Sequence, residues 1–327
     1  MRVAQLIRFG GPEVLTLAQA APQAPVDDQA LVRITSAGLN RADCLYREGK
    51  HYVRPQSFPA RIGYEAAGIV EAVGPAATFK IGDRVAGLPC GVDPITQGGF
   101  AEYMTVSSQL LLPTPSAVSD RDAGSLWMAY LTAGSVLLDA LHPDDIVVVT
   151  AASSSVGLAA IALGKLLGAT VLATTTHEAK RAAIAQAGAD HVINTKEQNY
   201  LTEVRKAVGG GNVNLFFDAV CGPMVNDHIR LGAVGSQIVI YGLLDTSPWT
   251  PHIGLMIGKH MRLQAFNVGS LLDPSPSRQR LVELITHGVN ERSLPLHIDR
   301  YFPLDELTSA QVYLESNEQI GKIVVVP

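Results

Sequence analysis

The residues best suited to chemistry are the small and hydroxyl-bearing ones at 151–157, with the sequence AASSSVG. They follow a β-branched run at 146–149, which is typical of a buried parallel strand. Apolar residues at helical spacing occupy 158–167, and Gly168 ends that predicted helix. A dinucleotide pyrophosphate needs close approach of the backbone and the free N–H groups of a helix N-terminus. The segment therefore predicts a dinucleotide-binding turn. Its members are Ala152, Ser153, Ser154, Ser155, Val156 and Gly157.

The glycine fingerprint of such turns, G-x-G-x-x-G, is incomplete here. It occurs as Ala152-x-Ser154-x-x-Gly157, with only the third glycine present. Gly157 still allows close packing of helix on strand, and the serine hydroxyls can donate hydrogen bonds to phosphate oxygens. An ordinary strand–turn–helix unit of an α/β domain is the alternative interpretation.

The end of the next strand indicates which dinucleotide is bound. Residues 171–173 continue as Thr174-Thr175-Thr176-His177, with no acid where NAD enzymes hydrogen-bond the ribose 2′-OH. Glu178 falls at the start of the following helix, where the helix dipole explains it. Lys180 and Arg181 add positive charge beside the threonines. The missing acid and the added charge favour NADPH, with the Thr175 and Thr176 hydroxyls as candidate ligands; a solvated helix face is the alternative.

Strands and helices alternate from residue 120 to 241, which predicts a doubly wound parallel sheet. The predicted helices span 120–140, 178–187, 200–208 and 225–231, and the further strands span 191–194, 213–218 and 237–241. The rhythm is lost after Pro251. Helices at 278–287 and 304–316, with strands at 297–301 and 321–326, follow.

The first 115 residues have another character. Short β-like runs at 30–34, 67–73, 84–87 and 100–106 alternate with Gly- and Pro-rich turns. This pattern predicts a mostly antiparallel β domain. The chain is therefore of the α/β class with two domains, and the C-terminal segment is expected to return to the first.

Composition places the chain among soluble enzymes of a reducing compartment. The apolar fraction is 47% over 327 residues, and the net charge of −5 gives no reason to expect nucleic acid. The N-terminus lacks the apolar run of a signal peptide, and no apolar stretch is long enough to span a membrane. Three scattered cysteines, Cys44, Cys90 and Cys221, are expected to be free thiols. We expect a cytoplasmic location.

Several motifs, in order along nearly the whole chain, carry a resemblance to a known family. The chain resembles the medium-chain dehydrogenase/reductase superfamily, in particular its zinc-free quinone oxidoreductase branch. The matching segments are Phe9-Gly10-Gly11-Pro12-Glu13-Val14-Leu15, Ala37-Gly38-Leu39-Asn40-Arg41-Ala42-Asp43, Gly63-Tyr64-Glu65-Ala66-Ala67-Gly68-Ile69-Val70, Val73-Gly74, Gly82-Asp83-Arg84-Val85, Gly98-Gly99-Phe100-Ala101-Glu102-Tyr103 and Gly321-Lys322-Ile323-Val324.

The resemblance implies a GroES-like β domain over residues 1–121, to which 263–327 return, and a Rossmann domain over 122–262. It also implies that Lys180 binds the 2′-phosphate of NADPH. In the family's alcohol dehydrogenases, a catalytic zinc is held by residues at positions that correspond to Asn40 and Tyr64, which are poor zinc ligands. A second, structural zinc needs four cysteines where only Cys90 occurs. We therefore expect no metal; an adventitious site is the alternative.

Without zinc, a plain alcohol has no Lewis acid to activate it, so the expected acceptors are quinones or alkenes conjugated to a carbonyl. By resemblance, Asn40, Tyr46 and Tyr52 line the acceptor pocket, where an amide or phenol can donate to a carbonyl oxygen. Packing roles for the tyrosines are the alternative. Thr132 matches the position that packs on the nicotinamide, unless it bonds only its own helix. Asn40, Thr132, Tyr241 and Gly242 complete the expected cofactor contacts.

The roles of three other residues near these positions are expected to be indirect. Glu65 is expected to have a structural or electrostatic role. Arg41 and Lys50 are expected to be solvated, and steering of polar substrates is the alternative. The family commonly forms homodimers through the edge of the Rossmann sheet, and residues 234–244 are the predicted pairing strand. Alternative functions are a 2-alkenal or enoyl-thioester reductase, another alcohol dehydrogenase-like enzyme, and a cofactor-binding structural protein without turnover.

Overall fold

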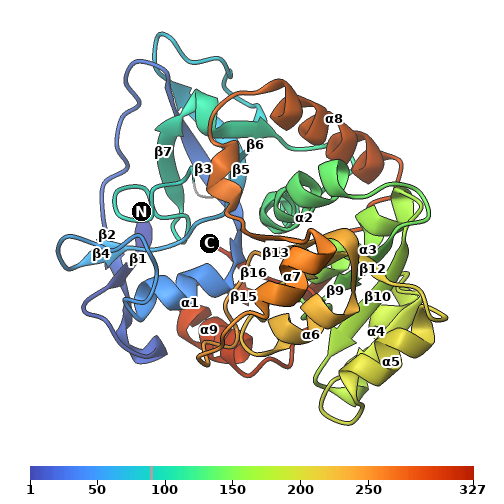
Figure 1. The fold of residues 1–327 in the computed structure, drawn as a ribbon. Helices are drawn as coiled ribbons and strands as arrows, with labels where there is room; N and C mark the ends of the chain where they lie inside the picture. Colours follow the sequence, from blue (N-terminus) through green and yellow to red (C-terminus); the bar gives the residue numbers. More distant parts are fainter. Residues whose placement is uncertain (89–90) are drawn as a thin grey trace. The chain divides into compact units, whose positions relative to one another are not determined.

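The computed structural model describes residues 1–88 and 91–327. The chain divides into two compact units, which Figure 1 shows in one ribbon view. The first unit comprises Met1–Met128, Val268–Ser275 and Leu296–Pro327, and the second comprises Ala129–Asn267 and Pro276–Pro295. The predicted α/β class, with one largely antiparallel and one parallel sheet, is confirmed.

The first unit is built on a seven-stranded sheet that is antiparallel except where β15 pairs with β16. The strand β7 (Tyr103–Ser107) pairs with β3 beside the main order of the sheet. That order is β15 (Ile298–Pro303), β16 (Lys322–Val326), β3 (Gln29–Leu39), β5 (Ala66–Val73), β6 (Arg84–Gly87) and β8 (Leu111–Pro113). A smaller sheet has the order β2 (Leu15–Gln19), β1 (Arg2–Leu6) and β4 (Ala60–Arg61).

The C-terminal strand completes the first unit's sheet. In β16, Ile323 pairs with Leu39 and Val325 with Ala37 of β3, so residues distant in the sequence share one core. The apolar side chains of β16 from Ile323 to Val325 are at most 1% exposed. The predicted helix at 304–316 is a 3₁₀ turn, Leu304–Glu306, followed by α9 (Leu307–Glu315).

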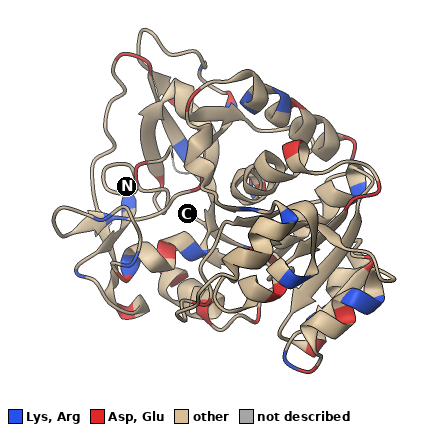
Figure 2. Cartoon of the chain, in the orientation of Figure 1, with Lys and Arg blue, Asp and Glu red and all other residues tan. Residues whose placement is uncertain are grey.

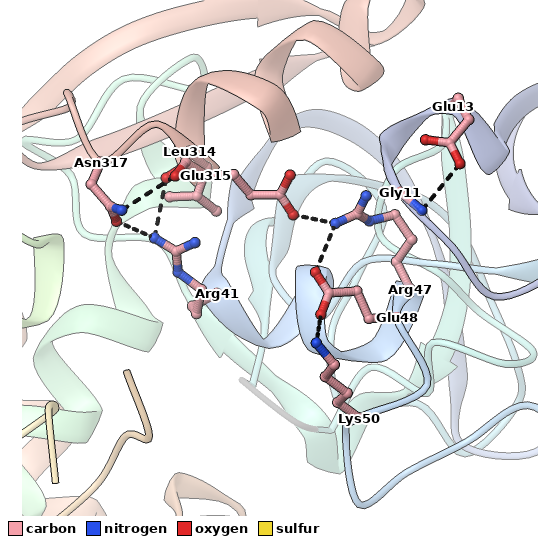
Figure 3. Close-up of polar contacts among 9 residues, drawn as sticks. All are labelled: Gly11, Glu13, Arg41, Arg47, Glu48, Lys50, Leu314, Glu315 and Asn317. Atoms are coloured by element: carbon pink, nitrogen blue, oxygen red, sulfur yellow. Dashed lines mark hydrogen bonds and ion pairs between the residues drawn. The ribbon is translucent and has the colours of Figure 1, made fainter. Parts of the chain in front are cut away.

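A short helix that the sequence did not predict, α1 (Arg41–Arg47), is fastened to α9 by polar contacts (Figure 3). Arg41 donates to the carbonyl of Leu314 at 3.1 Å and to Asn317 Oδ1 at 2.6 Å. The fully buried Arg47 bonds to Glu315 and, at 3.4 Å, to Glu48. These contacts fix the direction in which the chain leaves α1.

The expectation that Arg41 and Lys50 are solvated is therefore only half met. Lys50 is 70% exposed and pairs with Glu48 at 2.8 Å, as a surface lysine does. Arg41 is instead bound to the end of α9, because the last carbonyl groups of a helix need donors.

The second unit contains a six-stranded parallel sheet flanked by helices (Figure 1). Its strand order is β11 (His191–Asn194), β10 (Thr170–Thr175), β9 (Ile146–Val149), β12 (Val213–Asp218), β13 (Gly232–Ile240) and β14 (Arg262–Ala265). Helices connect or flank these strands: α2 (Trp127–Ala140), α3 (Ser155–Leu166), α4 (Arg181–Gln186), α5 (Tyr200–Ala207), α6 (Met224–Leu231) and α7 (Ile253–Lys259). The predicted doubly wound sheet is therefore present, and its central strands bury Val147, Val148 and Phe216 completely.

The last strand of this sheet corrects the predicted pairing segment. Residues 234–244 were expected to form the free edge, but β13 lies between β12 and β14. The edge belongs to β14, all four residues of which are exposed. The sequence analysis missed α7 and β14 because the apolar residues in that region face solvent and show no burial periodicity.

The helix α8 (Pro276–Asn290) belongs to the second unit, although residues 263–327 as a whole were expected to return to the first. Its apolar residues Leu281 and Ile285 are buried, and Leu281 packs against Gly134 of α2. The Tyr130 hydroxyl also donates to the carbonyl of Pro295 at 2.6 Å. These contacts explain why α8 packs with the second unit, although the chain on both sides of residues 276–295 belongs to the first. The predicted helix at 120–140 is likewise divided, into a 3₁₀ turn, Ala123–Ser125, and α2.

Figure 2 shows acidic and basic residues interspersed along the ribbon, in keeping with a net charge of −5. Among the described residues, no helix is both long and apolar enough to cross a membrane.

Candidate functional site

The turn between β9 and α3 has the geometry that the sequence predicts. Ser154 is the N-cap of α3, and its Oγ accepts the Gly157 N–H at 3.0 Å. A side chain at Gly157 would place its Cβ 2.7 Å from the Cα of Ala152 and 2.8 Å from the carbonyl oxygen of Ala151. Only glycine fits at this position, so the third glycine of the fingerprint keeps its packing role.

The turn also contains a backbone conformation that the sequence does not reveal. Ala151 has a φ of 47°, in the left-handed region that a non-glycine residue rarely adopts. The next residue, Ala152, donates its N–H to the carbonyl of Thr174 at 3.0 Å. That bond ties the turn to the end of β10, where the nucleotide-selecting residues were predicted.

Lys180 lies beside this turn. Its side chain is only 6% exposed, and its Nζ is 3.4 Å from Ser153 Oγ. The turn at 151–157 and the segment that contains Lys180, both predicted to bind the cofactor, are therefore in contact. The Thr175 hydroxyl accepts the N–H of His177 at 3.2 Å and is buried, whereas Thr176 is exposed at the strand end.

Glu178 is occupied by local contacts. One carboxylate oxygen pairs with Arg181 at 3.2 Å, and the other accepts from Asn194 Nδ2 at 3.2 Å. A carboxylate held in this way is a poor candidate for the acid that NAD enzymes use on the ribose. Arg181 has its charge paired, so Lys180 is the stronger candidate for an anionic ligand.

Tyr241 and Gly242 follow β13 near the carboxyl end of the sheet. The Tyr241 ring stacks on Phe217 with centroids 4.1 Å apart. Burial raises the pKa of Tyr241 well above its usual value, and the nearby Ser154 hydroxyl opposes this shift. A Cβ at Gly242 would lie 2.7 Å from the carbonyl oxygen of Ala219, so close packing requires glycine there. Thr132 is buried on α2 at 7% exposure.

A buried network that the sequence analysis missed fixes the ends of β9 and β12. Thr150 Oγ1 donates to Asp218 Oδ1 at 2.7 Å and accepts the Ala219 N–H at 2.8 Å. Burial acts to raise the pKa of Asp218, but donors from His228 and Thr150 hold it below its usual value. Asp218 therefore acts as a buried carboxylate that holds together the carboxyl ends of β9 and β12.

In the first unit, three predicted motif residues form one buried cluster. Lys322 Nζ lies 2.7 Å from Glu65 Oε2 and donates to Asn40 Oδ1 at 2.5 Å. Glu65 and Lys322 are each 2% exposed. Glu65 Oε1 also accepts the N–H of Met128 at 2.8 Å. The indirect role expected for Glu65 agrees with this position, while the sequence analysis gave Lys322 no role.

The cluster also occupies the Asn40 amide. Its Nδ2 donates to the carbonyl of Gly38 at 3.0 Å and to Glu65 Oε2 at 3.2 Å. An amide has two N–H donors, so both are used in this structure. Asn40 therefore positions Lys322 and Glu65 here, rather than presenting a free donor for a carbonyl.

Asp43 adjoins this cluster and is fully buried. Burial raises its pKa to about 7, and the charge of Glu65 adds to the shift, while hydrogen bonds from the backbone of Asn40 and Tyr64 and the charge of Lys322 oppose it. Its Oδ2 accepts the Asn40 N–H at 2.8 Å, which completes the N-terminal cap of α1.

The structure places the two predicted pocket tyrosines in different surroundings. Tyr46 is 0% exposed, and its ring meets Tyr64 edge-on with centroids 6.0 Å apart. Burial raises the pKa of Tyr46 to about 12. Tyr52 is 66% exposed and lies against the ring of His51 at 4.2 Å. Of the two, only Tyr52 offers its ring to a ligand in this structure.

The residues at the expected zinc positions do not fit a metal. The Asn40 oxygen is bound to an ammonium group, and the Tyr64 hydroxyl is 3.0 Å from His51 Nδ1. Within residues 1–88 and 91–327, no group of three His, Cys, Asp or Glu side chains is arranged to hold a metal ion. Cys44 and Cys221 are buried free thiols, and Cys90 lies outside the described residues.

Comparisons with known proteins agree with this architecture. The alcohol dehydrogenase GroES-like domain matches residues 26–116, and a domain described as zinc-binding dehydrogenase matches residues 155–287. The quinone oxidoreductase of Pongo abelii is 31% identical over 255 residues, which are 77% of this chain and 76% of the relative. The quinone oxidoreductase of Sus scrofa is 27% identical over 99% of this chain and 97% of its own.

Among solved structures, Escherichia coli quinone oxidoreductase in complex with NADPH has a similar fold. Its TM-score is 0.91 with 24% identity, and the match covers all of both chains. The sequence motifs, the two domain types and the 31% identical relative all agree. The chain is therefore an enzyme of the medium-chain dehydrogenase/reductase superfamily and belongs to its quinone oxidoreductase branch.

Proposed function

We propose that this enzyme binds NADPH at the turn between β9 and α3 and reduces a quinone or an α,β-unsaturated carbonyl compound without zinc. One observation carries the choice of cofactor. The buried Lys180 ammonium lies 3.4 Å from Ser153 Oγ, so a cation stands beside the predicted phosphate turn. A cation there suits the extra 2′-phosphate that distinguishes NADPH from NADH.

The residues of the second unit fit such a cofactor. The first turn of α3 offers N–H groups to the pyrophosphate, and Gly157 lets α3 pack closely against the turn. Lys180, with the Thr175 and Thr176 hydroxyls, would hold the 2′-phosphate. Glu178 is bound to Asn194 and Arg181 and does not compete. The NADPH complex of the Escherichia coli enzyme supports this assignment.

When bound, NADPH supplies a hydride from its nicotinamide ring. We assign the positioning of that ring to Thr132 and the stacking of a flat acceptor to the exposed Tyr52. Asn40 holds the Lys322–Glu65 pair in place, and that pair contributes a fixed charge distribution behind the acceptor site.

The residues at the metal positions favour acceptors that need no Lewis acid. Neither Asn40 nor Tyr64 provides a zinc ligand, and both are engaged in other hydrogen bonds. A plain alcohol would lack the means to lose its proton near neutral pH. A quinone or enone is already electrophilic, so alignment and stabilisation of the developing oxyanion suffice.

A panel of acceptors tests this proposal directly. Purified enzyme is assayed for NADPH oxidation with 1,4-benzoquinone, a 2-alkenal and an enoyl-CoA, and the product is analysed after reaction with deuterium-labelled NADPH. We expect turnover with the quinone or the alkenal and label in an alkenal product. Activity with enoyl-CoA alone would favour the thioester reductase alternative, and no activity with any acceptor would contradict the proposal.

We also propose a homodimer in which the β14 edges of two copies pair. The support is that all four residues of β14 are exposed, together with apolar side chains on α7, such as Ile257 at 69% exposure. An uncovered strand edge of this kind pairs readily with another strand. The free thiols Cys44 and Cys221 support a reducing cytoplasmic location.

A further inference from the structure

His51 lies in the loop after α1 and makes two hydrogen bonds through one ring nitrogen. The Val53 N–H donates to His51 Nδ1 at 3.1 Å. A backbone N–H can only donate, so Nδ1 carries no proton and must also accept from the Tyr64 hydroxyl, 3.0 Å away. A neutral imidazole has one N–H, and here it must be on Nε2.

The surroundings of the ring favour this neutral form and hold it in one orientation. Burial lowers the pKa of His51, and the side chain is 8% exposed. One side of the ring lies 5.1 Å from the buried Tyr64, and Tyr52 lies 4.2 Å away by ring centroids. The ring therefore bridges a buried tyrosine and the exposed tyrosine that we assign to the acceptor.

We propose that the Nε2–H of His51 donates a hydrogen bond to the carbonyl oxygen of the acceptor during reduction. This assignment rests on the proposed function. Hydride addition places negative charge on that oxygen, and a fixed donor stabilises the charge as it develops. The Asn40 N–H groups are bound to Gly38 and Glu65, and Tyr46 is enclosed, so neither supplies such a donor in this structure.

Two substitutions separate donation by Nε2 from simple packing. His51→Leu removes the donor, whereas His51→Gln can place an amide N–H near the same point. We expect His51→Leu to lower kcat about 100-fold with benzoquinone, the loss typical of a removed oxyanion donor. His51→Gln should stay within about tenfold of the unmodified enzyme, and neither variant should change NADPH affinity. His287→Leu, on the exposed face of α8, is the matched control.

Two readouts do not depend on turnover. In the ligand-free protein, ¹⁵N NMR of the histidine rings should show His51 neutral and protonated on Nε2. Binding of 4-nitrophenolate, whose oxygen imitates the reduced acceptor, should be weakened by His51→Leu and retained by His51→Gln.

The outcomes distinguish this inference from the proposed function. If none of the tested acceptors supports NADPH oxidation by the unmodified enzyme, the proposed function fails. If it turns over and His51→Leu keeps the same kcat, or His51→Gln loses as much as His51→Leu, the inference is overturned while the function stands. A proton found on Nδ1 would overturn it even where the variants fold poorly.

Discussion

Lys322→Met tests whether the buried cluster of Asn40, Glu65 and Lys322 stabilises the first unit. Removing the ammonium leaves the Glu65 carboxylate buried at 2% exposure. The Met128 N–H at 2.8 Å and the Asn40 Nδ2 at 3.2 Å would remain as donors to Glu65. Loss of one partner from a buried ion pair costs about 3–5 kcal/mol, because the other charge stays out of water.

The expected loss is near the lower end of that range, about 3 kcal/mol, because two donors to Glu65 persist. A double variant, Lys322→Met with Glu65→Gln, should recover most of the loss, since it buries no charge and Gln can still accept from Met128. The surface pair Arg33–Glu71, with side chains 43% and 39% exposed, provides a matched control. Arg33→Met should cost at most about 1 kcal/mol.

Urea denaturation followed by tryptophan fluorescence measures these differences. Trp127 lies in the first unit and is 1% exposed, whereas Trp249 lies in the second. In a Trp249→Phe background, the fluorescence change reports unfolding around Trp127, which precedes the Met128 N–H that binds Glu65. If Lys322→Met costs no more than Arg33→Met, or if the double variant is less stable than Lys322→Met, the cluster does not act as described.

Three further predictions concern the cofactor, pH and assembly. Lys180→Ala should weaken NADPH binding about 10- to 100-fold, the value of a charge-assisted hydrogen bond, and leave NADH binding unchanged. Fluorescence titration measures both affinities, with Lys206→Ala as the control. Equal losses of affinity for the two cofactors would refute the assignment. The pKa of Asp43 is raised to about 7 in the folded protein, from an ordinary value of 3.8. The protonated carboxyl thus favours the folded state, and this stabilisation, complete below about pH 4, is lost as the pH rises through about 7. Relative to Asp43→Asn, the unmodified protein should therefore lose stability between these pH values in urea titrations; a constant difference would contradict this. Leu263→Lys on β14 should shift a dimer toward monomer in sedimentation velocity, unlike Val312→Lys on α9; a monomeric unmodified protein would refute the interface.

Local patterns in the sequence were sufficient to predict most of the fold. The β-branched run at β9, the small-residue turn and the helix at α3 agree with the structure within a few residues, because parallel strands buried on both faces have a distinctive composition. The return of the C-terminal strand to β3 also agrees with expectation. The elements α1, α7 and β14 were missed, since short or solvent-facing segments lack apolar periodicity.

Residues of the candidate site were predictable where a local sequence pattern marks them. The turn residues and Lys180 were named from sequence, and the structure shows Lys180 in contact with Ser153. The partners of Asn40 depend on pairing between distant strands, so no local pattern reveals them. Lys322 did carry a signal, because a lysine that opens the apolar run 323–326, of which Ile323 to Val325 are buried, needs a buried anion. His51 carried none, since its tautomer depends on a loop conformation that directs the Val53 N–H at Nδ1.

Reduction of an electrophilic acceptor in the absence of metal is the central claim, and one experiment addresses it most directly. The enzyme is dialysed against a strong chelator, its metal content is determined by mass spectrometry, and NADPH oxidation with 1,4-benzoquinone is measured before and after. We expect less than stoichiometric zinc and an unchanged rate. Stoichiometric zinc, with activity that is lost on chelation and restored by Zn²⁺, would contradict the account.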